Sequence, residues 1–131
     1  DKNKSMDKLK NFGPVYYLNL DGQPDRKEYM ETQFQYWGVT NYERISAYDG
    51  RDDDLSDIIK GRYPEMMTSG EIGCTTSHLK AIKHWYETSD SPYAIIMEDD
   101  VKIYKNFNRV IDLVFDNLPI KFSTAWITIL T

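Results

Sequence analysis

Short apolar runs alternate with amphipathic segments along most of this chain, and that alternation limits the folds open to it. The runs PVYYLNL, YAIIM and TAWITIL predict strands at residues 14–20, 93–97 and 124–130. The run YERISAYDG, residues 42–50, predicts a short strand that closes in a turn at Asp49 and Gly50. Apolar residues at helical spacing predict helices at 24–37, 68–89 and 106–119. Strands that alternate with helices predict an α/β sandwich with a largely parallel sheet, whose ligands bind beyond the carboxyl ends of the strands.

The longest predicted helix carries its own start signal, because Thr68 and Glu71 have the spacing of a capping box. We expect its apolar residues to form one buried stripe. That stripe consists of Ile72, Leu79, Ile82 and Tyr86.

The 131 residues suffice for one domain with one core, since 40% of them are hydrophobic. We expect a polar N-terminal segment over residues 1–13 and a single domain over 14–131. The domain is expected to be trimmed, because the chain stops directly after an apolar run.

Composition also bears on partners and on location. A net charge of -5 and a pI near 5.0 argue against a nucleic-acid duplex as a partner. The longest apolar runs are far too short to span a bilayer, so no membrane insertion is expected. A single cysteine, Cys74, cannot form an internal disulfide, which fits a reducing compartment and a cytoplasmic location.

Three consecutive carboxylates, Glu98, Asp99 and Asp100, directly follow the third predicted strand. Each like-charge neighbour raises the cost of ionising the next, so the triplet requires either open water or a bound cation. In extended backbone Glu98 and Asp100 project to one side and Asp99 to the other, so that one pair can converge on a cation. An oxygen-only set favours Mg²⁺ or Mn²⁺ over zinc. An exposed acidic loop is the alternative interpretation.

Polar residues also follow the first two predicted strands. Arg26 lies in the first turn of a predicted helix, where its guanidinium and the helix N-terminus both favour an anion such as phosphate. A surface salt bridge is the alternative for Arg26, a helix cap for Asp21 and a satisfied strand end for Asn19. Asp49 either shapes the turn before Gly50 or accepts a hydrogen bond from a ribose hydroxyl or a nucleobase.

We expect no zinc site, because Cys74, His78 and His84 lack the spacing of zinc ligands. We expect Cys74 to be a small core residue. A histidine in mid-helix is usually structural, but His78 together with Ser77 could face a ligand at the sheet edge.

Four segments, YYLNLDGQPDRKE, RISAYDG, SGEIGCTTSHLKA and YAIIMEDDV, resemble in order and spacing the sequence blocks of glycosyltransferase family 25. That family includes bacterial lipopolysaccharide galactosyl- and glucosyltransferases and the animal enzymes that galactosylate collagen. The resemblance implies a GT-A fold, a Rossmann-like arrangement. It also implies a nucleotide-sugar donor, with a UDP-sugar expected, and inverting transfer of galactose or glucose to a saccharide or glycoconjugate hydroxyl.

The resemblance also implies roles for individual residues. In that fold an acidic motif at a strand end holds Mn²⁺, or Mg²⁺, on the donor diphosphate. By position, Asp100 becomes the main metal ligand and Glu98 a second ligand or a ribose contact. No general base is assigned, and a non-catalytic or truncated nucleotide-binding domain is the alternative to an active enzyme. The residues expected to bind the donor are Asn19, Asp21, Arg26, Asp49, Ser77, His78, Glu98 and Asp99.

Overall fold

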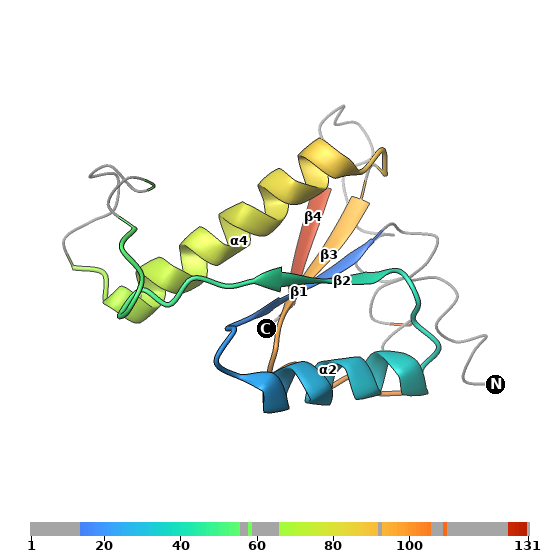
Figure 1. Ribbon diagram of the computed structural model, residues 1–131. Helices are drawn as coiled ribbons and strands as arrows, with labels where there is room; N and C mark the ends of the chain where they lie inside the picture. Colours follow the sequence, from blue (N-terminus) through green and yellow to red (C-terminus); the bar gives the residue numbers. More distant parts are fainter. Residues whose placement is uncertain are drawn as a thin grey trace.

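Within the part of the chain that the structure describes, four parallel strands form one sheet in the order β2-β1-β3-β4 (Figure 1). The computed structural model describes residues 14–55, 58, 66–91, 93–105, 109 and 126–130. The predicted parallel sheet is confirmed, since every pair of neighbouring strands is parallel. The strands are β1 (Val15–Asn19), β2 (Tyr42–Ser46), β3 (Tyr93–Glu98) and β4 (Trp126–Leu130).

Two helices cover opposite faces of this sheet (Figure 1). Helix α2 (Pro24–Tyr36) connects β1 to β2, and helix α4 (Ser69–Thr88) carries the chain back past β1 to β3. The direction of winding therefore reverses between β1 and β3. In open α/β sheets this reversal separates the two crossover connections and leaves a crevice at the carboxyl ends of the strands.

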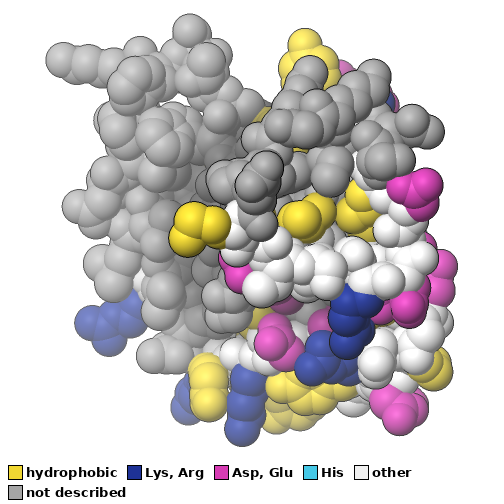
Figure 2. Space-filling view, turned by 90° about the vertical axis from the view of Figure 1, so that its left-hand side faces the viewer, with side chains coloured by type: hydrophobic (Ala, Val, Ile, Leu, Met, Phe, Trp, Pro, Cys, Tyr) yellow, Lys and Arg dark blue, Asp and Glu magenta, His cyan; other side chains and the backbone are white. Residues whose placement is uncertain are grey.

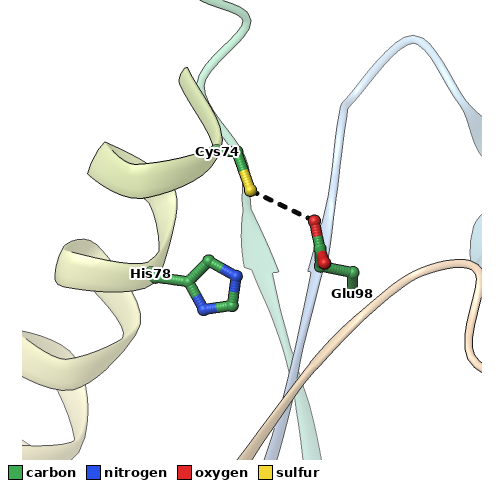
Figure 3. Close-up of side chains that lie close together, drawn as sticks. All are labelled: Cys74, His78 and Glu98. Atoms are coloured by element: carbon green, nitrogen blue, oxygen red, sulfur yellow. Dashed lines mark hydrogen bonds between the residues drawn. The ribbon is translucent and has the colours of Figure 1, made fainter. Parts of the chain in front are cut away.

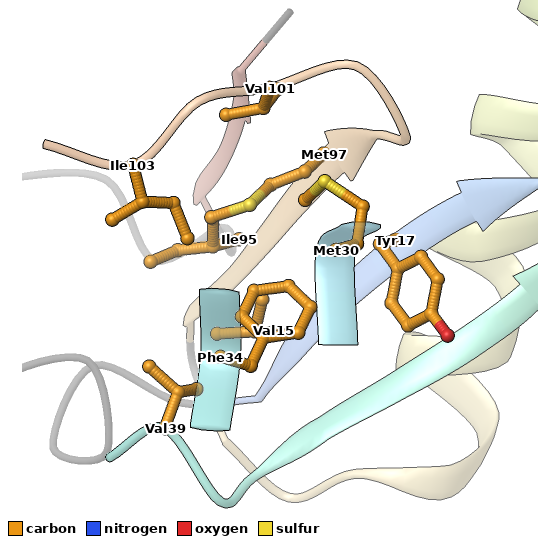
Figure 4. Close-up of a cluster of buried hydrophobic side chains, with 9 residues drawn as sticks. All are labelled: Val15, Tyr17, Met30, Phe34, Val39, Ile95, Met97, Val101 and Ile103. Atoms are coloured by element: carbon orange, nitrogen blue, oxygen red, sulfur yellow. The ribbon is translucent and has the colours of Figure 1, made fainter. Parts of the chain in front are cut away.

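The α2 face holds the larger apolar cluster (Figure 4). Met30 and Phe34, four residues apart, point from α2 onto alternate residues of β1 and β3, and both are fully buried. Gly38 ends the helix with a positive φ of 75°, as its sequence position predicts. The cluster consists of Val15, Tyr17, Met30, Phe34, Val39, Ile95, Met97, Val101 and Ile103.

The α4 face is packed differently from the sequence prediction. Thr68 caps α4 as predicted, its side chain accepting from the Glu71 N–H at 3.1 Å. The predicted apolar stripe is wrong at Leu79 and Tyr86, which are exposed, whereas Ile82 packs against the core on this face. Apart from Trp85, the buried positions of the helix are held by small residues. The buried residues of α4 are Gly73, Thr76, Ser77, Ala81 and Trp85.

The structure tests the predicted last strand but not the predictions for two other segments. The predicted last strand is present as β4, beside β3. The polar segment at 1–13 and the predicted helix at 106–119, except for residue 109, lie outside the described residues. Among the described residues, no helix is long and apolar enough to cross a membrane.

A contact between two glycines fixes the loop after β2 against the start of α4. A Cβ built on Gly50 would lie 1.7 Å from the backbone oxygen of Ser69, and one on Gly73 would lie 2.5 Å from the Gly50 nitrogen. Both distances are far below contact distance, and both clashing groups are backbone. The loop that carries Asp49 therefore depends on the absence of side chains at these two positions.

This close contact predicts that Gly73→Ala lowers the free energy of unfolding by about 1–3 kcal/mol, the usual cost of overpacking. Gly70→Ala in the same helix is the matched control, because its Cβ would meet nothing nearer than 4.0 Å. The control should be as stable as the original protein or slightly more so, since alanine favours a helix. Chemical denaturation measures both, and equal stability of the two variants would contradict the packing described.

Candidate functional site

A pocket of about 270 Å³ opens at the carboxyl end of the sheet, where the winding reverses between β1 and β3. Acidic and basic side chains lie next to one another on this face of the molecule (Figure 2). The pocket is therefore a mixed-charge site at the position where α/β sheets bind ligands. Its polar lining includes Arg26, Asp49, Arg51, Cys74, Ser77, Glu98 and Asp99.

Asp99 and Asn19 join the ends of β3 and β1 on the α2 side. Asn19 is 2% exposed, and its Nδ2 donates to Asp99 Oδ2 at 2.8 Å and to the Gln23 carbonyl oxygen at 3.0 Å. Arg26 Nη1 contacts Asp99 Oδ1 at 3.2 Å. The predicted alternation is confirmed here, since Asp99 points away from the side that Glu98 occupies. Asp99 therefore holds Arg26 at the pocket, and Asn19 holds Asp99.

Arg44, a residue the sequence analysis did not single out, completes this network from β2. Its Nε donates to Asn19 Oδ1 at 2.9 Å, and its Nη2 donates to the Asn19 carbonyl at 3.0 Å and to Asp21 Oδ1 at 2.6 Å. Ser46 Oγ donates to the same Asp21 oxygen. The bonds from Arg44 and Ser46 hold the pKa of Asp21 below its usual value. Asn19 and Asp21 thus brace the strand ends and do not line the pocket.

The loop after β2 forms another wall of the pocket. Ser77 Oγ accepts from the Tyr48 N–H at 2.8 Å and donates to the Gly73 carbonyl at 2.6 Å, so this buried serine ties the loop to α4. Arg51 contacts both Asp49 carboxylate oxygens, at 3.0 and 3.1 Å, and holds the pKa of Asp49 below its usual value. Asp49 therefore reaches the pocket as a charged acceptor, already paired with an exposed arginine.

On the α4 side, Glu98 faces Cys74 and His78 (Figure 3). Cys74 Sγ donates to Glu98 Oε1 at 3.1 Å. Burial, then the Glu98 hydrogen bond, raise the pKa of Cys74 to about 11. Burial lowers the pKa of His78, and Glu98 opposes this shift. The imidazole and thiol are thus neutral at pH 7.

Two predictions about these residues are wrong. Cys74 is exposed and lines the pocket; it is not a core residue. Zinc-ligand spacing is present after all, because Cys74 and His78 are four residues apart on α4 and share one helix face. Their ligand atoms and one oxygen of Glu98 all lie within 4.8 Å of one another. That spacing is the sequence signal that could have revealed the cluster.

Asp100 is exposed in the turn that follows β3. It does not line the pocket, but its negative charge adds to that of Glu98 in raising the pKa of Cys74. Glu98 and Asp100 therefore both act on the Cys74 thiol through their charge. Of the predicted donor-binding residues, the structure brings five to the pocket wall: Arg26, Asp49, Ser77, Glu98 and Asp99.

The sequence of this chain is similar to those of known glycosyltransferases. Residues 12–128 match the sequence model of a family described as glycosyltransferase family 25, LPS biosynthesis protein. A predicted glycosyltransferase of Acanthamoeba polyphaga mimivirus is 30% identical over 109 residues, which are 79% of this chain and 33% of that protein. A glycosyltransferase 25 family member of Aedes aegypti is 31% identical over 114 residues, or 79% of this chain and 18% of that protein.

A third relative carries a different description. Glycosyltransferase 25 family member 3 of Bos taurus, named a "probable inactive" member, is 28% identical over 121 residues. That match covers 82% of this chain and 20% of the bovine protein. The chain thus spans a third or less of the length of these relatives.

The Cys74–Glu98 contact makes a prediction about thiol reactivity. Glu98→Gln removes the charged acceptor and lowers the pKa of Cys74, so alkylation by iodoacetamide at pH 8 in EDTA should accelerate. We expect about threefold for each unit that the pKa falls, because the thiolate fraction rises tenfold while the nucleophilicity of the thiolate falls. Mass spectrometry follows the rate, and Glu87→Gln, at the far end of α4, is the matched control. An unchanged rate in Glu98→Gln would contradict the contact.

Proposed function

Since the chain belongs to glycosyltransferase family 25, we propose that it transfers a sugar from a nucleotide-sugar donor and that the pocket between β1 and β3 binds that donor. One observation carries the proposal. The pocket brings Arg26 and the acidic end of β3 together at the point where the winding of the sheet reverses. Arg26 can bind an anionic diphosphate. The carboxylates at the end of β3 can hold the cation that neutralises the charge of the diphosphate.

Helix α2 supports binding of the diphosphate. It begins at Pro24 beside the pocket, and Gln23, at its N-cap position, makes no side-chain hydrogen bond to the helix. A helix N-terminus favours an anion, and Arg26 lies in the first turn with its side chain about half exposed. Only Nη1 of its guanidinium contacts Asp99, so other N–H groups of Arg26 can donate to phosphate oxygens.

The carboxylates at the end of β3 fit a hard divalent cation. Mg²⁺ and similar ions are commonly held by one or two carboxylates together with substrate phosphates. Asp99 is already engaged by Asn19 and Arg26, which leaves Glu98 and Asp100 as the two carboxylates of the triplet for a cation. We propose that Glu98 and Asp100 hold Mn²⁺ or Mg²⁺. When bound, the ion stabilises charge that develops on the departing nucleoside diphosphate.

The chain's own residues then position the donor. Asp99 orients Arg26, and buried Asn19 fixes Asp99. The guanidinium is therefore already oriented before the diphosphate binds, which lowers the entropy cost of binding. Asp49 is placed to accept a hydrogen bond from a ribose hydroxyl, since the glycine contact with α4 fixes its loop at the pocket wall. Ser77 maintains that wall through Tyr48.

We propose the substrates from the chain's membership of the family. A UDP-sugar carrying galactose or glucose is the donor, and a saccharide or glycoconjugate hydroxyl is the acceptor. We propose transfer with inversion at the sugar carbon.

A second function has one observation in its favour. The bovine relative is named a probable inactive member of the same family. Under this alternative the pocket binds a nucleotide but no sugar is transferred. Measured turnover of a UDP-sugar separates the two, because binding alone releases no UDP over repeated cycles.

Metal-dependent nucleotide binding is the test of the proposed site. UDP should raise the melting temperature with Mn²⁺ present and do little in EDTA, because a ligand that binds only the folded state stabilises it. Asp100→Asn should lose most of the Mn²⁺-dependent shift, since an amide is a poorer ligand for a hard cation. Asp90→Asn, an exposed acid after the end of α4, is the matched control and should keep it. Equal shifts in Mn²⁺ and in EDTA, or a full shift in Asp100→Asn, would overturn the metal assignment.

A further inference from the structure

Cys74, His78 and Glu98 present three different ligand atoms to one small space beside the pocket (Figure 3). Cys74 and His78 come from successive turns of α4, and Glu98 comes from the last position of β3. One sulfur, one imidazole nitrogen and one carboxylate oxygen lie within 4.8 Å of one another. Cys74 Sγ and Glu98 Oε1 are 3.1 Å apart.

We propose that these three side chains bind a zinc-class divalent ion, Zn²⁺ or Co²⁺, with the fourth coordination position open toward the pocket. Tetrahedral bonds of about 2.0–2.3 Å place ligand atoms about 3.3–3.7 Å apart, so the side chains need to close by only about 1 Å. Three protein ligands and one open position are the arrangement of zinc sites that bind an exchangeable group. The thiol proton leaves as the sulfur–metal bond forms, and the solvent buffer takes it up.

The surroundings support this assignment. Nδ1 of His78 is buried and has no hydrogen-bond partner among the described residues, so no group there fixes the ring's orientation through that atom. Cys74 is exposed and Glu98 lines the pocket, which gives an ion a path from solvent. Both supporting elements are anchored, α4 by its Thr68 cap and β3 by pairing with strands on both sides.

The chemistry of the ligands separates this site from the carboxylate pair proposed above. Thiolate and imidazole select zinc-class ions, whereas an oxygen-only set selects Mg²⁺ or Mn²⁺. The two sites share Glu98, so a zinc-class ion would compete with Mn²⁺ for that carboxylate. The inference does not rest on the proposed function, because the three ligands converge whether or not a nucleotide binds.

Cobalt absorption tests the site directly, because only a sulfur–cobalt bond gives a strong near-ultraviolet charge-transfer band and the chain has a single cysteine. Co²⁺ is titrated into reduced protein without added Mg²⁺ or Mn²⁺, because those ions would compete for Glu98; Co²⁺ held by oxygen ligands alone gives no such band. We expect a band that saturates at one ion per chain and that equimolar Zn²⁺ removes. The absence of a band at millimolar Co²⁺ would overturn the proposal.

Variants show whether all three residues are ligands. Cys74→Ser should abolish the band, and His78→Gln and Glu98→Gln should each weaken Co²⁺ binding by at least about tenfold, since even loss of an outer-shell partner costs 10–100-fold. His84→Gln is the matched control, because His84 lies on the same helix but pairs with Glu43. Unchanged affinity in His78→Gln and Glu98→Gln would show binding by the thiol alone and overturn the site. Thermal unfolding confirms that each variant is folded.

Discussion

The buried hydrogen bond from Asn19 to Asp99 is the contact on which the rest of the site depends. It joins the ends of β1 and β3, the two strands between which the winding reverses. Both groups are nearly inaccessible to water, so the loss of either partner would leave a buried polar group unsatisfied. Arg44 adds a tie from β2 and Arg26 extends the network to the pocket, so one asparagine aligns three strands and α2.

Strand alternation gives the end of β3 two different chemical sides. Asp99 turns toward α2 and joins the hydrogen-bonded network with Asn19 and Arg26. Glu98 turns toward α4 and meets a thiol and an imidazole, while the charge of exposed Asp100 also raises the pKa of that thiol. The acid triplet is therefore divided between a structural role and a ligand role. This division explains how three adjacent carboxylates can occur beside a pocket without all facing one another.

The sequence predicted what depends on periodicity and missed what depends on close packing. The strands, the start and end of α2, the Thr68 cap and the opposite orientations of Glu98 and Asp99 follow from local patterns and are confirmed. The predicted buried face of α4 was wrong at Leu79 and Tyr86, because small residues and Trp85 hold the buried positions of this helix. Cys74 and Arg44 were missed because their roles arise from contacts between residues distant in sequence.

The central claim is that a nucleoside diphosphate and its cation occupy the reversal between β1 and β3. A crystal structure of the protein with UDP and Mn²⁺, with anomalous scattering to place the manganese, tests it most directly. We predict Mn²⁺ bonded to oxygens of Glu98 and Asp100 and to the diphosphate, with Arg26 donating to a phosphate oxygen. A diphosphate bound elsewhere, for example in the hollow between β2 and α4 that Lys80 and Lys83 line, would contradict the claim.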